Sequence, residues 1–193
     1  MARKILIGVA AVIVLLVLVI LTRPSTFHVE RSITMAAPPE NAFAQVNDFH
    51  AWPAWSPWEK LDPQMKRTHE GSPAGVGAKY AWVGNDQVGE GRMTIEKSEK
   101  PSTVAIKLEF LKPWEATNAT TFTFAPTPQG SKVTWAMEGE NNFMAKAASL
   151  FMDMDKMIGA DFEKGLAAMK GLAETAPKAA PAPAAQPANP AAP

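Results

Sequence analysis

The chain has 193 residues, no cysteine, and 19 acidic against 19 basic side chains. The absence of cysteine excludes disulfides, thiolate catalysis and cysteine-ligated zinc or iron–sulfur sites. Four basic residues lie outside residues 24–175, so that central part carries 15 basic and 19 acidic side chains. This balance, without a basic stripe, argues against nucleic-acid binding, which depends on clustered lysine and arginine.

The N-terminal segment predicts a membrane anchor over residues 1–24. Arg3 and Lys4 precede an unbroken apolar run from Ile5 to Leu21. This run is at the lower limit for a helix that spans a bilayer, and it is too long for an ordinary signal-peptide core. The residues that follow lack the small side chains of a cleavage site, which favours an uncleaved signal anchor. The positive charges at the start favour a cytoplasmic N-terminus and a folded domain on the exocytoplasmic side.

The first folded elements are a strand and two short helices. Alternate residues from Phe27 to Met35 are mostly apolar, which is typical of a strand with one buried face. The Pro38-Pro39 pair breaks this strand and opens a short helix with an apolar stripe. A second short helix or turn is expected at 50–58. That stretch holds three of the six tryptophans, and it predicts either a plug at one end of a sheet or the rim of an apolar pocket.

Six further strands follow from alternating polarity and turn residues. They are predicted at 66–70, 77–83, 91–96, 103–111, 115–125 and 131–138. Their spacing favours antiparallel hairpins, and their alternation predicts a sheet that is covered on one face only.

The last ordered element is predicted to be a helix of about 20 residues that covers the sheet. Its apolar residues step by three and four: Phe151, Met154, Ile158, Phe162, Leu166 and Met169. Asp153 is a candidate N-cap, and Asn142 marks an alternative, earlier start. Residues 176–193 are mainly alanine and proline, which predicts a disordered, partly polyproline II tail.

Several short segments, in this order, resemble those of a known superfamily. They are Arg31-Ser32-Ile33, Ala37-Pro38-Pro39-Glu40, Trp52 with Trp55-Ser56-Pro57-Trp58, Gly77–Trp82, Gly89–Met93, Val133-Thr134-Trp135 and Met154–Gly159. Over residues 27–173 the chain resembles the SRPBCC (START-like, helix-grip) superfamily, in its polyketide cyclase/dehydrase and lipid transport branch. The resemblance implies an α+β fold for residues 25–175, in which a curved seven-stranded antiparallel sheet wraps around the long C-terminal helix. It also implies an apolar cavity between the two.

The inward-facing side chains predict the lining of such a cavity. They are mostly aromatic or flexible, which suits an adaptable apolar site. With the tryptophan stretch they give this candidate ligand-binding set: Trp52, Trp55, Trp58, Tyr80, Trp82, Met93, Ile106, Leu108, Phe110, Phe122, Phe124, Trp135, Met154, Ile158 and Phe162. The leading hypothesis is a membrane-anchored domain that binds a hydrophobic small molecule or lipid, with no cofactor, no metal and no nucleic-acid partner.

Two alternatives stay open. The first is an enzyme of the cyclase or hydrolase kind, with Asp155 or Tyr80 as the proton-transfer group. On a helical wheel Asp155 lies near the apolar stripe, and a carboxyl group that faces an apolar cavity would have a raised pKa. Its alternative role is a carboxylate at the helix edge, paired with a lysine or a backbone donor. The second alternative is a structural or interaction module whose core is completely filled.

Overall fold

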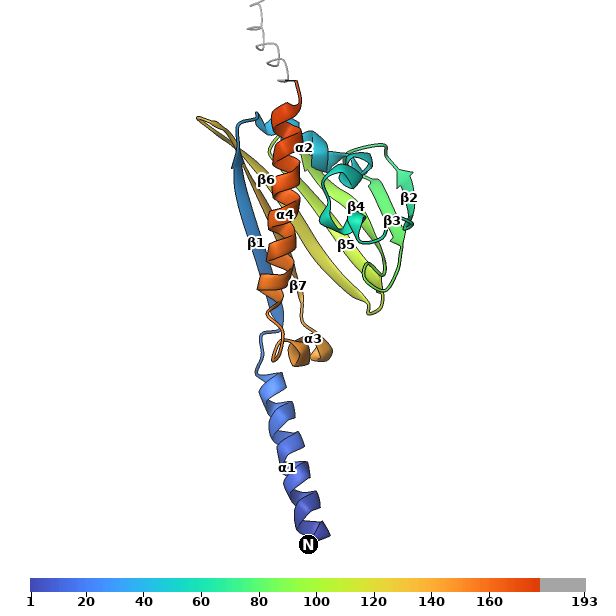
Figure 1. The fold of residues 1–193 in the computed structure, drawn as a ribbon, viewed down its shortest axis with the longest axis vertical. Helices are drawn as coiled ribbons and strands as arrows, with labels where there is room; N and C mark the ends of the chain where they lie inside the picture. Colours follow the sequence, from blue (N-terminus) through green and yellow to red (C-terminus); the bar gives the residue numbers. More distant parts are fainter. Residues whose placement is uncertain (178–193) are drawn as a thin grey trace, which may run out of the picture.

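The computed structural model describes residues 1–177, so nearly all of the predicted Ala/Pro tail lies outside the described residues. The helices are α1 (Ala2–Leu21), α2 (Pro39–Asn47), the 3₁₀ helices η1 (Phe49–Ala54) and η2 (Pro57–Lys60), α3 (Phe143–Ala148) and α4 (Met154–Thr175). The strands are β1 (Thr26–Met35), β2 (Lys66–Gly71), β3 (Ala78–Val83), β4 (Glu90–Glu99), β5 (Thr103–Lys112), β6 (Ala116–Thr127) and β7 (Gly130–Glu140) (Figure 1).

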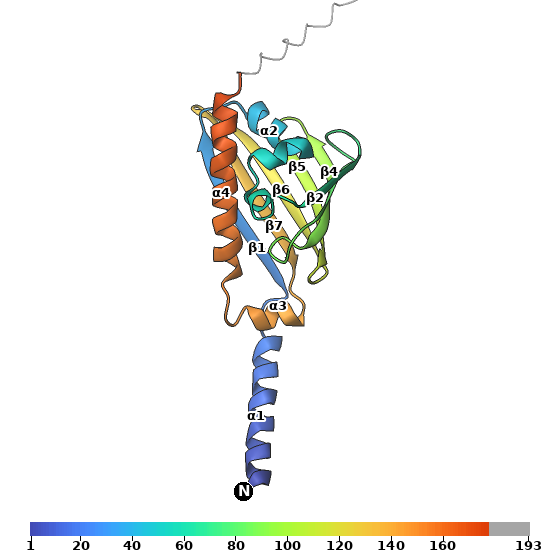
Figure 2. The ribbon, with the colours of Figure 1, turned by 45° about the vertical axis from the view of Figure 1, so that its right-hand side comes forward.

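The seven strands form one antiparallel sheet in the order β1-β7-β6-β5-β4-β3-β2. The sheet curves, and α4 lies along β1 on its concave side, with α2 and the 3₁₀ helices over the remaining strands (Figures 1 and 2). This confirms the α+β helix-grip fold. The largest difference between a predicted and an observed strand is in β4. This strand continues past the predicted end at residue 96 to Glu99, because a bulge after Ile95 lets the chain keep pairing with β5.

The long helix begins later than its apolar pattern predicts. The Asp153 side chain accepts a hydrogen bond from the Lys156 amide at 3.1 Å, which makes Asp153 the N-cap, as predicted. Phe151 therefore lies outside α4 and is 86% exposed, so its assignment to the buried stripe is wrong. Asn142 does not start the same helix. It caps the separate helix α3 through a hydrogen bond from the Ala145 amide.

The contact between α4 and the sheet is centred on Trp135 of β7. Its indole ring stacks on the Phe162 ring with centroids 4.0 Å apart and planes 7° apart, and on Phe122 at 4.7 Å. All three rings are buried. Gly165 lies over the same indole, and a Cβ at this position would be too close to the ring. A glycine one turn from Phe162 thus lets the helix lie directly on the tryptophan.

Arg31 of β1 makes the second attachment of α4. Its guanidinium group pairs with Asp155 at 2.9 Å and with Glu163 at 3.0 Å. It also donates to the Asp155 carbonyl at 3.1 Å. The group passes beneath Gly159, where any Cβ would overlap it. Arg31 thereby ties the first three turns of the helix to β1.

This packing predicts that Gly159→Ala does not gain the stability that alanine normally adds to a helix. The added methyl group meets the end of the Arg31 side chain and displaces it from its two carboxylates, which offsets the gain in helix propensity. Gly171→Ala, in the same helix, is the matched control because a Cβ there meets no atom within 4 Å. It should stabilise the protein by about 1 kcal/mol through helix propensity. Urea unfolding measures both, and equal effects of the two substitutions would contradict the assignment.

Candidate functional site

The centre of the concave face is filled by aromatic rings. Trp52 and Trp55 are 4% and 1% exposed, and their indole N–H groups donate to the Val46 and Gln45 carbonyls at 3.1 and 3.0 Å. Both rings pack edge-on against Phe122. These two tryptophans therefore close the sheet beneath α2, which is the role of a plug.

Trp58 of η2 lies differently from the other two. It is only half-buried, and its ring meets Trp135 and Phe162 edge-on at 5.7 and 6.4 Å. The indole thus covers the outer side of the Trp135–Phe162 stack. Trp58 marks the boundary between the filled centre of the concave face and the part beyond it.

Beyond Trp58 the apolar side chains of the concave face are only partly covered. We call this part the α3 end, because β7 runs from it directly into α3 (Figure 2). The core residues there that keep partial exposure are Phe27, Leu108, Phe110 and Ile158. Two buried residues, Asn118 and Met137, lie among them, with the Asn118 amide 3.9 Å from the Met137 sulfur. The predicted lining is therefore closed at the centre and half-covered at the α3 end.

Two buried polar atoms lie at the edge of this half-covered part. Trp135 Nε1 and Thr120 Oγ1 have no hydrogen-bond partner among the described residues. Their residues are 2% and 4% exposed. Thr120 pairs with Met137 and Trp135 with Phe122, so the two are diagonal neighbours on one face. Buried polar atoms are nearly always paired, and a donor beside a hydroxyl suits a ligand with one polar group.

The other predicted lining residues occupy the core or its edge. Trp82, Met93, Ile106 and Phe124 are buried, and the Trp82 indole donates to the Val88 carbonyl at 3.0 Å. Met154 lies in the first turn of α4 and is 41% exposed. Of the predicted lining residues, those at the α3 end are therefore the ones that an external molecule can reach.

A buried polar cluster surrounds Tyr80. Its hydroxyl group donates to Glu59 at 2.6 Å, and the other Glu59 oxygen accepts from Arg67, also at 2.6 Å. Burial, followed by the hydrogen bond to Glu59, raises the pKa of Tyr80 well above its usual range. Glu59 and Arg67 carry no recognisable signal in the sequence, because only the fold of η2 against β2 and β3 brings them together. With every member paired, this cluster holds η2 in place.

Asp155 takes the role of a paired carboxylate at the helix edge. Its side chain is 56% exposed and bonds Arg31. The hydrogen bond from Arg31 lowers the pKa of Asp155, the opposite of the shift expected in an apolar cavity. Its partner is neither a lysine nor a backbone donor, but an arginine on the strand beneath it.

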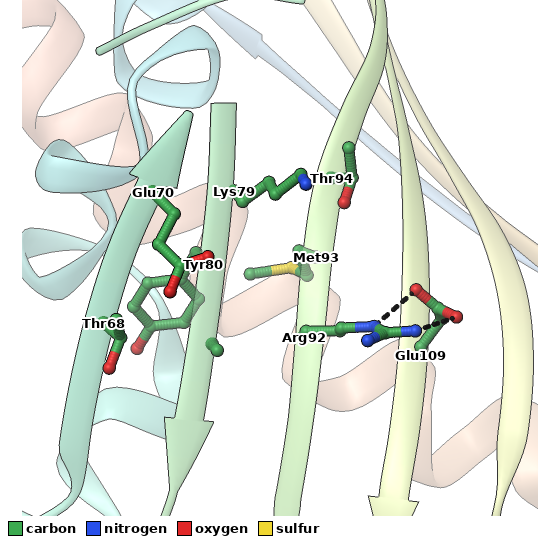
Figure 3. A pocket seen from close by; sticks show the side chains of 9 residues that line it. Thr68, Glu70, Lys79, Tyr80, Arg92, Met93, Thr94 and Glu109 are labelled. Carbon is green, nitrogen blue, oxygen red and sulfur yellow. Dashed lines mark hydrogen bonds and ion pairs between the residues drawn. The ribbon is translucent and has the colours of Figure 1, made fainter. Parts of the chain in front are cut away.

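The outer face of the sheet carries a polar groove of about 310 Å³ (Figure 3). Alternation places its side chains opposite the inward-facing Tyr80 and Met93. They include Thr68, Glu70, Lys79, Arg92, Thr94 and Glu109. Arg92 bonds both oxygens of Glu109, at 2.8 and 3.0 Å. A second hollow of about 400 Å³ lies between the β6–β7 turn and the end of α4. Neither hollow lies between α4 and the concave face.

A family model matches most of the chain. The family model for polyketide cyclase/dehydrase and lipid transport matches residues 26–174, which include every strand and most of α4. Comparison with curated proteins gives no match.

Solved structures share the fold at low sequence identity. Protein CV1439 from Chromobacterium violaceum is 17% identical with a TM-score of 0.54, over 78% of this chain and 99% of that one. The di-domain ARO/CYC StfQ from the steffimycin biosynthetic pathway is 13% identical with a TM-score of 0.59, over 78% of this chain and 51% of that one. The Aha1 dimer from Colwellia psychrerythraea is 14% identical with a TM-score of 0.56, over 77% of this chain and 97% of that one. At these identities the likeness shows the fold alone.

The Tyr80 cluster predicts that Arg67→Met is more destabilising than Tyr80→Phe. The first change leaves the Glu59 carboxylate buried without its cation, which costs about 3 kcal/mol. The second removes one hydrogen bond to a charged group and costs about 2 kcal/mol. The order of the two urea-unfolding midpoints checks this, and a smaller effect of Arg67→Met would contradict the cluster.

The Arg92–Glu109 pair predicts a pH dependence of stability. The hydrogen bond from Arg92 lowers the pKa of Glu109 to about 2, from an ordinary value of 4.5. The ionised carboxylate therefore stabilises the fold above about pH 4.5, and this stability is lost as the pH falls toward 2. The difference in unfolding free energy between the wild type and Arg92→Met should shrink over that interval. A difference that stays constant between pH 6 and the acid limit of folding would disprove the coupling.

Proposed function

Because the chain belongs to the polyketide cyclase/dehydrase and lipid transport family, we propose that it binds a hydrophobic small molecule or a lipid between the sheet and α4. The α3 end of the concave face is the proposed site. The apolar body of the ligand packs against Leu108, Phe110 and Phe27, with Trp58 and Ile158 on the opposite side. These side chains are only partly buried in the structure, so the ligand would cover their exposed parts.

The observation that carries this proposal is the unpartnered pair of Trp135 Nε1 and Thr120 Oγ1. Both atoms are buried, and both lie on the concave face where the half-covered part begins. A ligand with one polar head and an apolar body satisfies the indole N–H and the hydroxyl group while covering the exposed apolar residues.

The N-terminal helix supports a membrane location for this binding domain. α1 is 20 residues long with a mean hydropathy of 3.2, and only 6% of its apolar window is buried. These properties are compatible with a single-pass anchor or with a signal sequence. We propose that α1 remains as the anchor, with residues 25–175 as the binding domain on the exocytoplasmic side.

The two alternatives have less support in the geometry. In a cyclase-type reaction the proton-transfer group must reach the ligand. The Tyr80 hydroxyl group is buried against Glu59, and Asp155 pairs with Arg31 at the exposed helix edge. A completely filled core agrees with the stacked rings around Trp135, but it does not explain why Leu108 and Phe110 are partly exposed. The ligand-binding proposal accounts for both parts of the concave face.

The test uses Leu108→Trp, which fills the proposed site, and Leu111→Trp as its matched control. Leu111 lies on the same strand but is exposed and alternates to the other face. The full chain in nanodiscs of phosphatidylethanolamine and phosphatidylglycerol is released into the gas phase for native mass spectrometry. One retained lipid is expected on the wild type and on Leu111→Trp, and its loss on Leu108→Trp.

The same lipid occupancy in both variants would refute the site. Urea unfolding of Leu108→Trp controls for a folding defect, because a folded variant without the lipid isolates the effect on binding.

A further inference from the structure

An apolar surface surrounds the point where α1 meets the folded domain. Outside residues 1–21, eleven large apolar side chains are exposed among the described residues, and six of them lie within residues 143–157. We call these six the apolar collar: Phe143, Met144, Phe151, Met152, Met154 and Met157. Such a concentration is unusual for a surface in water and marks a contact with another apolar phase.

Hydrogen bonds fix the collar relative to α1. Only residues 22–25 connect α1 to β1. Arg23 in this connection donates to the Ser149 hydroxyl at 3.2 Å and to the Ser149 carbonyl at 2.9 Å. Asn141 donates to the Pro24 and Thr26 carbonyls at 3.2 and 3.3 Å. Ile20 is 5% exposed, so the last turn of α1 packs into the same junction. The collar therefore cannot swing away from the end of α1 without breaking these contacts.

The geometry points to the lipid bilayer as the occupant of this surface. Figures 1 and 2 place α3 between α1 and the sheet, directly beyond the last turn of α1. When α1 crosses a membrane, its Leu21 end reaches the interfacial layer, and the residues beside that end are at the same depth. Phenylalanine and methionine side chains are accommodated at the acyl boundary. The Phe151 and Met152 amides, between the two helices, already donate to the Ala148 carbonyl.

An aromatic residue on the β5–β6 turn supports the same orientation. Trp114 is 72% exposed. Asn118, close behind it, pairs with Gly139, which places this turn at the α3 end of the sheet. Tryptophan is typical of the membrane–water interface.

We propose that the apolar collar lies in the membrane interface and seats the domain on the bilayer, with the α3 end of the concave face turned toward the lipid. This inference rests on the proposed anchor role of α1, but it does not depend on ligand binding. The collar then acts as a second contact with the membrane, and the domain has one fixed orientation instead of rotating on a flexible tether.

The test uses single-cysteine variants of the full chain, which has no native cysteine. Met144→Cys and Phe151→Cys report on the collar. Gln129→Cys, on the exposed β6–β7 turn at the opposite end of the sheet, is the water-exposed control. Val12→Cys reports on α1. Each variant carries a nitroxide label and is placed, one copy per disc, in phosphatidylethanolamine/phosphatidylglycerol nanodiscs. Its accessibility to a water-soluble nickel complex and to oxygen is then measured.

Labels at 144 and 151 should be several-fold less accessible to nickel than the label at 129, and more accessible to oxygen. The label at Val12 should give the strongest protection. The proposal is overturned if the collar labels are as accessible to nickel as the label at Gln129, whether or not the Val12 label lies in hydrocarbon. Because each disc holds one copy, a second copy of the chain cannot be what covers the collar. The mass-spectrometric test for a retained lipid does not depend on the result of this experiment.

Discussion

The stack of Trp135 on Phe162 is the contact on which the arrangement of sheet and helix depends. It joins β7, in the half of the sheet nearest β1, to the middle of α4, and Trp55 and Trp58 pack edge-on against the same indole. Offset and edge-on aromatic contacts contribute about 1 kcal/mol each beyond the area that they bury. Because these rings meet at one point, they divide the concave face into a filled centre and a half-covered α3 end. Glycine at 159 and 165 allows the close approach.

Electrostatic contacts set the position of α4 along the sheet, and the aromatic contacts set its depth. Arg31 holds the first turns of the helix, while Glu174 accepts from the Ala36 amide near its last turn. Contacts therefore hold the helix near both of its ends. The Tyr80–Glu59–Arg67 cluster holds η2 from below.

The sequence predicts the strands well because one face of the sheet is apolar and the other is wet, so polarity alternates along each strand. It leaves the start of α4 open, since Asp153 and Asn142 are both candidate caps and the apolar pattern extends to Phe151. The hydrogen bond from the Lys156 amide identifies Asp153 as the cap. The partner of Asp155 depends on the register of β1 beneath α4, and the neighbours of Tyr80 depend on how η2 folds back. The apolar residues of the candidate lining can be recognised from the sequence. Which of them are buried by neighbouring rings depends on packing in three dimensions.

The central claim is that an apolar ligand reaches the α3 end and leaves the filled centre unchanged. The six tryptophan indole N–H groups report on both regions. A ¹H–¹⁵N spectrum of the full chain in nanodiscs, titrated with a medium-chain fatty acid, measures them directly. The account predicts that the Trp135 and Trp58 indole signals shift, while those of Trp52 and Trp55, bonded to the Val46 and Gln45 carbonyls, stay in place. Shifts at Trp52 and Trp55 with none at Trp135 would contradict it.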